Sequence, residues 1–189
     1  MIKKNVKSLD KGGFICYNDV KNKKEKFMNI FLPEESVFDS IRDLDDLRLK
    51  KQIIECRTIL ELSLNKSKGG YAHHPVVVHY ARYPVFVAWY GHLACLEFYD
   101  RFGHMHKYGE YFLEKFNTLH TNATNEELNS LSHIPAFYCE GNKGDPHCIR
   151  TTENTVELFR NKLCIKWDKD VRVPKWTNRF PPKWYIEEE

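Results

Sequence analysis

The feature that most constrains this chain is an amphipathic pattern over residues 40–65. Apolar side chains recur there at helical spacing and fall on one face of a helix with 3.6 residues per turn: Ile41, Leu44, Leu49, Ile53, Cys56 and Leu60. Arg48, Gln52 and Glu55 form a polar line beside that face. The pattern predicts one long helix, and the run Asn-Lys-Ser-Lys-Gly-Gly at 65–70 predicts where it ends.

The rest of the chain also favours helices. A short extended segment at 28–33 precedes the first helix, and a second helical region is expected from Pro75, with a bend at Pro84, to Gly103. Further helices are expected at 108–117, 125–131 and 151–162, the last with Thr151 or Thr152 as N-cap. Few segments alternate in the manner of strands, so we expect an all-α, compact single-domain helical bundle.

The C-terminal residues differ in character from this bundle. Beyond Trp167, three prolines exclude a continuous helix, which predicts an extended tail draped over the core. The tail is both aromatic and basic. Its rings are Trp167, Trp176, Phe180, Trp184 and Tyr185.

Charge is distributed unevenly along the chain. The net charge is +3, but lysines crowd residues 3–26, and lysines and arginines crowd residues 160–183. Two basic clusters fit a polyanionic partner such as nucleic acid, although charge runs are also common on solvated surfaces.

The six cysteines lie at scattered spacings without a CxxC pair, which favours reduced thiols and a cytoplasmic protein. No signal-peptide pattern and no apolar run of about 18 residues occurs, so neither export nor a membrane span is expected.

Several patches, in a fixed order, resemble one known family. They are the 28–33 entry with its helix, Ala-His-His-Pro-Val at 72–76, Gly-His-Leu at 91–93 with Leu-Glu-Phe-Tyr-Asp-Arg at 96–101, Ile-Pro at 134–135 with Gly-Asp-Pro-His at 144–147, and Pro-Pro-Lys-Trp-Tyr at 181–185. Together they are similar to the pyrimidine-dimer DNA glycosylases over residues 28–186. The resemblance divides the chain into a basic arm at 1–27 and a glycosylase-like helical domain at 28–189.

The resemblance implies a catalytic role for Glu55, because the family's phage member pairs a chain-terminal amine with a glutamate on its first long helix. Without that likeness, a lone glutamate on an amphipathic helix is usually surface decoration. In this chain 27 residues precede Met28. Either Met28 is the natural start and an amine is exposed there, or the chain starts at Met1 and the matching amine lies within a peptide bond. Either Glu55 activates water and leaves an abasic site, or another amine attacks and forms a Schiff base that permits strand cleavage.

Other candidate residues carry two readings each. Arg48 either holds a phosphate or orients Glu55, or else it forms a helix-surface ion pair with Asp45. Lys51, four residues before Glu55, is either a solvated charge or a substitute nucleophile. His74 and His147 occupy family-like positions and either contact DNA or serve the fold.

DNA affinity is expected from the C-terminal third. Phosphates would be neutralised and bases stacked by Arg160, Lys162, Lys175, Trp176, Trp184 and Tyr185. About half of the tail's rings are expected to anchor the tail to the core instead.

We therefore expect a monomeric DNA glycosylase without a cofactor, acting on double-stranded DNA to excise a pyrimidine dimer or a hypermodified cytosine. One alternative is a zinc-dependent hydrolase or structural zinc site built from His104, His106, Cys139, His147 and Cys148, although their spacing matches no tight zinc pattern. A second alternative is a DNA-binding module without catalysis.

Overall fold

The computed structural model describes residues 28–65, 71–132 and 152–186, and within them every regular element is a helix. The helices are α1 (Val37–Asp43), α2 (Asp46–Asn65), α3 (Pro75–Tyr80), α4 (Pro84–Phe102), α5 (Gly109–Thr121), α6 (Asn125–Ser132), α7 (Thr152–Lys169) and α8 (Lys183–Ile186). The predicted all-α fold is confirmed. The predicted arm at 1–27 and the loop at 141–146 lie outside the described residues.

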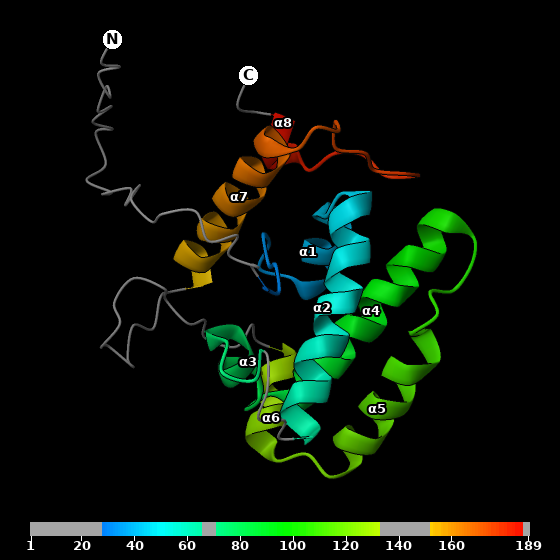
Figure 1. Ribbon diagram of the computed structural model, residues 1–189, viewed down its shortest axis with the longest axis vertical. Helices are drawn as coiled ribbons and strands as arrows, with labels where there is room; N and C mark the ends of the chain where they lie inside the picture. Colours follow the sequence, from blue (N-terminus) through cyan, green and yellow to red (C-terminus); the bar gives the residue numbers. More distant parts are fainter. Residues whose placement is uncertain (1–27, 66–70, 133–151, 187–189) are drawn as a thin grey trace.

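Helix α4 lies at the centre of the bundle, packed between α2 and α5 (Figure 1). Helix α6 also packs against α4. Gly91 permits the close approach of α5, because a Cβ at this position would lie 2.3 Å from the Phe112 ring. Gly103 ends α4 in the left-handed region at φ 73°, as a helix C-cap glycine does. The expected helical region from Pro75 to Gly103 is present, but in place of the expected bend at Pro84 the non-helical residues 81–83 separate two helices, α3 and α4.

The predicted single helix over 40–65 is wrong, because two helices meet at Leu44–Asp45. Leu44 takes an extended conformation with ψ 133°, and the Asp45 carboxylate accepts the Leu47 backbone N–H at 3.2 Å as the cap of α2. Trp167 Nε1 donates to the same carboxylate at 2.9 Å. A contact between residues so far apart in sequence leaves no local signal.

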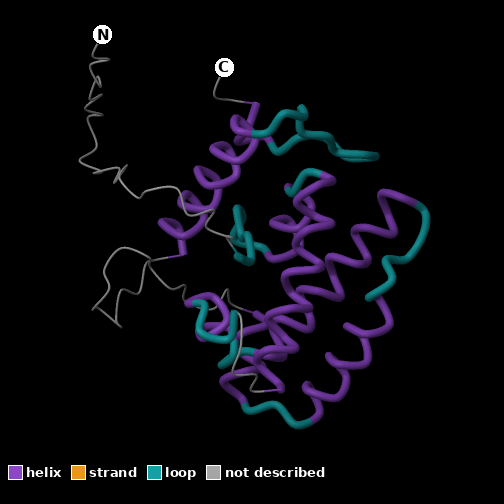
Figure 2. Tube along the Cα trace, viewed as in Figure 1, coloured by secondary structure: helices purple, strands orange, loops and turns teal. Residues whose placement is uncertain are grey.

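Two further boundaries differ from the prediction at the C-terminal end. Helix α7 continues to Lys169 rather than stopping at 162, because Leu163 and Trp167 extend its buried face. The tail is non-helical from 170 to 182, as predicted, but ends in the short helix α8 (Figure 2). Thr151 lies outside the described residues.

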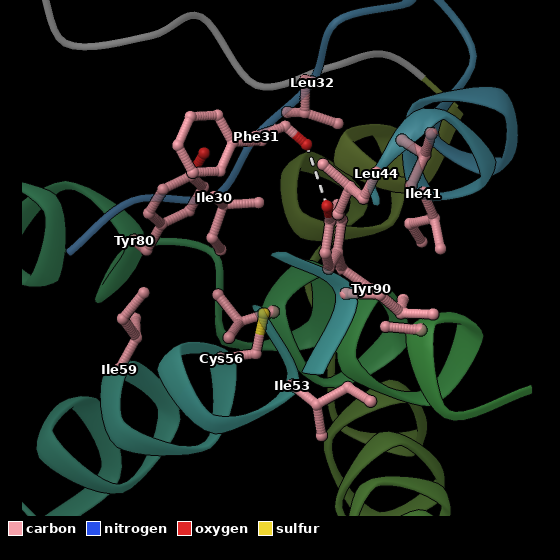
Figure 3. Packing of buried hydrophobic residues seen from close by; sticks show 14 of the residues in the cluster. Ile30, Phe31, Leu32, Ile41, Leu44, Ile53, Cys56, Ile59, Tyr80 and Tyr90 are labelled. Atoms are coloured by element: carbon pink, nitrogen blue, oxygen red, sulfur yellow. Dashed lines mark hydrogen bonds between the residues drawn. The ribbon is translucent and has the colours of Figure 1, made fainter. Parts of the chain in front are cut away.

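The entry segment at 28–33 crosses the core rather than lying on its surface. Ile30 and Leu32 are fully buried among side chains of α1, α2 and α4 (Figure 3). Tyr90 on α4 donates its hydroxyl to the Phe31 carbonyl oxygen at 2.8 Å, and the Phe31 ring packs edge-on against Phe159 of α7. The segment therefore joins α7 to the bundle (Figure 1).

Candidate active site

The polar line predicted on the first long helix exists on α2 and faces the entry segment. Arg48, Gln52 and Glu55 are all buried polar residues of that helix. Gln52 fixes the segment with two hydrogen bonds: its Oε1 accepts the Phe31 N–H at 3.0 Å, and its Nε2 donates to the Asn29 carbonyl oxygen at 2.7 Å. The backbone beside Glu55 is thus held by side-chain hydrogen bonds.

Glu55 is only 9% exposed, and two donors reach its carboxylate. The Asn29 backbone N–H donates to Oε2 at 3.4 Å, and Lys51 Nζ lies 3.5 Å from Oε1. Burial raises the pKa of Glu55 above the ordinary value for a glutamate, while the charge of Lys51 and the Asn29 hydrogen bond oppose that rise. The sequence-predicted pair Glu55 and Lys51 is therefore brought together.

Lys166 of α7 adds a positive charge to this site that the sequence analysis missed. Burial lowers the pKa of its amine, with a further lowering from the charge of Lys51, whereas Glu55 acts in the opposite direction. Its Nζ lies 5.8 Å from the centroid of the Phe31 ring. In the sequence, Lys166 is one of many basic residues near the C-terminus, and no spacing links it to Glu55.

Arg48 lies two helical turns before Glu55 on α2 and is paired with two carboxylates. Its Nη1 is 3.5 Å from Asp45 and is hydrogen-bonded to Asp170, which follows α7. The ion pair with Asp45 weighed from the sequence is present, and Asp170 is an addition that only the fold supplies. Arg48 therefore ties α2 to the end of α7.

The aromatic residues of the tail gather at the start of α2. Trp167 stacks on Trp184 with ring centroids 5.6 Å apart, and Tyr185 and Trp176 lie edge-on to Trp167 at 4.7 and 5.3 Å. The indole N–H of Trp184 donates to the Asp43 carboxylate at 2.6 Å. These four rings pack on one another and on the protein, whereas Phe180 is 93% exposed.

Asp43 lies beneath these rings. Burial raises its pKa to about 7, the Trp184 hydrogen bond opposes the rise, and the neighbouring Glu34 adds to it. Arg160 donates to the Pro33 carbonyl oxygen at 2.8 Å and pairs with Glu34 at 2.6 Å. The guanidinium of Arg160 thus already has protein partners.

The remaining predicted residues are spread over the molecule. His74 caps α3, its Nδ1 accepting the Val76 N–H at 3.3 Å. Lys162 lies on α7 with its Nζ 5.9 Å from the Phe159 ring centroid, and Lys175 is exposed on the tail. His147 lies outside the described residues. DNA contact by any of these residues stays a prediction.

The zinc alternative can be assessed only in part. Cys139, His147 and Cys148 lie outside the described residues. The residues that the structure describes contain no group of three or more His, Cys, Asp or Glu side chains that could hold a metal ion. His104 and His106 both pack edge-on against the Phe98 ring.

Residues 28–109, which include the entry segment, Lys51 and Glu55, match the family model described as pyrimidine dimer DNA glycosylase. Over these residues the chain is similar to that family. The predicted resemblance is thereby confirmed, although the match does not extend to the patches expected near residues 134–185. No curated protein and no solved structure matches the chain.

The match to the glycosylase family model supports DNA glycosylase activity and DNA as the binding partner. No helix in the described ranges is long and apolar enough to cross a membrane.

Proposed function

We propose that this chain extrudes an altered pyrimidine nucleotide from double-stranded DNA and hydrolyses its N-glycosidic bond with the help of Glu55, leaving an abasic site. One observation carries the proposal. In the part of the chain that matches the glycosylase family, a buried carboxylate lies 3.4 Å from the Asn29 backbone nitrogen and close to two lysines. The family resemblance implies a chain-terminal amine beside this glutamate, and here the nitrogen beside it is the peptide nitrogen of Asn29.

The nitrogen beside Glu55 is an amide, because Met28 precedes Asn29. An amide nitrogen does not attack C1′, so the main chain does not supply the nucleophile, and we favour water in that role. Glu55 takes a proton from that water while the water oxygen bonds to C1′. At the same time, the bond from C1′ to the base breaks. The base leaves with the bonding electrons and is then protonated. The negative carboxylate also stabilises the positive charge that develops on the sugar.

Two lysines could supply an amine in place of water. The Nζ atom of Lys51 is held by the Glu55 carboxylate at 3.5 Å, so an attack by Lys51 would have to break this ion pair. Lys166 is half-buried with a lowered pKa and is therefore the better candidate. Attack by a lysine would form a Schiff base, which borohydride reduction traps as a covalent complex. We favour water, and efficient trapping of the full-length protein would refute that choice.

We assign the phosphate contacts chiefly to Lys162 and Lys175. Arg160 would contribute less, because its guanidinium is already paired with Glu34. Trp176, Trp184 and Tyr185 would act mainly by orienting the tail. His74 and His147 stay candidates for contact with the nucleotide.

The altered base is either a pyrimidine dimer or a bulky modified cytosine such as a glucosylated one. The latter substrate would make the protein an anti-phage defence factor rather than a repair enzyme. Incubation with ultraviolet-damaged DNA and, separately, with glucosylated phage DNA, followed by scoring of abasic sites, distinguishes the two substrates.

The proposal is tested with Glu55→Gln, which keeps the side chain's shape but removes its charge. Base release should fall by at least about a hundredfold, as for other groups that stabilise transition-state charge, while duplex binding stays within twofold. Glu110→Gln, an exposed acid on α5, is the matched control and should leave both unchanged. Turnover of Glu55→Gln within tenfold of the wild type would exclude Glu55 as the catalytic group.

A further inference from the structure

The segment 170–182, which joins α7 to α8, exposes three large apolar side chains. Val173 and Phe180 are 89% and 93% exposed, and Val171 is fully exposed. Elsewhere in the described part of the chain, no large apolar side chain exceeds 52% exposure. Exposed apolar side chains gathered in one short segment usually mark a binding surface.

This exposure does not come from a loose backbone. The Asp46 N–H donates to the Lys175 carbonyl oxygen at 2.8 Å, and the Asp46 carboxylate accepts the Thr177 hydroxyl at 2.6 Å. Asn178 then donates its side-chain amide to the Arg101 carbonyl oxygen at 2.9 Å. The segment is therefore fixed across the start of α2 and the end of α4 (Figures 1 and 2).

Phe180 is held outward by its neighbours in the chain. The guanidinium of Arg179 donates to both carboxylate oxygens of Glu97, at 2.9 and 3.0 Å. Pro181 and Pro182 restrict the backbone on the other side, since the proline ring fixes φ. Little backbone entropy remains to be lost when the Phe180 ring binds a partner.

The charges around these apolar side chains indicate the kind of partner. Lys169, Arg172, Lys175 and Lys183 are exposed and form no ion pair within the described residues. A second copy of the chain that covered the apolar side chains would bury these like charges together. A nucleic acid instead offers phosphates to the cations and stacked bases to the ring.

We propose that segment 170–182 is a duplex-DNA contact whose Phe180 ring inserts at a base step while the flanking cations reach phosphates. The inference rests on the proposed function, which supplies DNA as the partner. An inserted apolar side chain partly unstacks the duplex and bends it, and this lowers the cost of extruding a nucleotide. The tail's stacking role thus falls to Phe180 rather than to the packed rings of Trp176, Trp184 and Tyr185.

The test uses the full-length protein with Phe180→Ala and, as matched control, Leu113→Ala, an exposed apolar residue on α5 at the far end of the bundle (Figure 1). Affinity for a duplex carrying 2-aminopurine is measured at two salt concentrations, together with the fluorescence of that base. Phe180→Ala should weaken binding about tenfold, because the stacking of a base on the ring is lost. The slope of log K against log salt should stay unchanged, because no charge is removed.

The outcomes separate the inference from the proposed function. Phe180→Trp should restore affinity and the 2-aminopurine fluorescence change, and Leu113→Ala should bind within twofold of the wild type. If Phe180→Ala binds as tightly as the wild type, the inference is wrong while the proposed function stands. If Phe180→Ala instead converts a dimer into a monomer, the partner is a second copy. Absence of duplex binding by the wild type would overturn the proposed function itself.

Discussion

Replacing Gln52 with leucine tests whether hydrogen bonds from α2 hold the backbone beside Glu55. Leucine has a similar volume but leaves the buried Phe31 N–H and the half-buried Asn29 carbonyl oxygen without their partner. A buried polar group that loses its hydrogen bond costs about 1–3 kcal/mol. Because water reaches Asn29 in part, we expect the free energy of unfolding to fall by about 2–4 kcal/mol.

Urea unfolding of the wild type and of Gln52→Leu measures this loss. The control is Ile54→Gln, which places the same amide on the exposed side of α2 and should change the free energy of unfolding by less than about 0.5 kcal/mol. Base release by folded Gln52→Leu should also fall, because the Asn29 N–H would no longer be held against Glu55. A loss below about 0.5 kcal/mol would refute the reasoning, since packing of Ile30 and Leu32 would then suffice to hold the segment.

Three other predictions follow from the site. Lys51→Met should move the acid limb of the pH–rate profile for base release to higher pH. The reason is that the charge of Lys51 opposes the rise that burial causes in the pKa of Glu55, and the reaction needs the ionised carboxylate; an unchanged limb would contradict this. Asp43 binds its proton more tightly in the folded protein, so its contribution to stability should decline as pH rises from about 4 to about 7, and thermal unfolding of Asp43→Asn should lack this decline. A chain that begins at Asn29 places a free amine 3.4 Å from Glu55 and should be trapped by borohydride, unlike the full-length protein; equal trapping of both would point to Lys166.

Several features of the fold could be predicted because they depend on neighbours in the sequence. The break before Pro84 and the end of α4 at Gly103 follow from the backbone preferences of proline and glycine. The alignment of Lys51 and Glu55 follows from helical periodicity, and the structure places their charged groups 3.5 Å apart. The sequence therefore indicated the central part of the candidate site on α2.

The errors arose where residues distant in sequence decide local structure. At Leu44–Asp45 the Asp45 carboxylate caps α2 and also accepts a hydrogen bond from Trp167; Asp is a common N-cap residue, but the apolar periodicity continues through 40–65, and the Trp167 contact leaves no signal in that stretch. From sequence composition alone, the aromatic residues of the tail fit DNA contact and core packing equally well. Only their stacking on one another and the bonds to Asp43 assign most of them to packing.

The sequence by itself determined that the chain forms amphipathic helices, where prolines and glycines interrupt them, and that Glu55 lies on the same helix face as Gln52. These properties follow from the geometry of a few consecutive residues. Only the tertiary structure decided that α7 brings Lys166 near Glu55, that the Asn29 nitrogen faces that carboxylate, and that Phe180 points outward. Each of these depends on how α7 and the tail pack against α2 and the entry segment, and helical periodicity carries no information about such long-range packing.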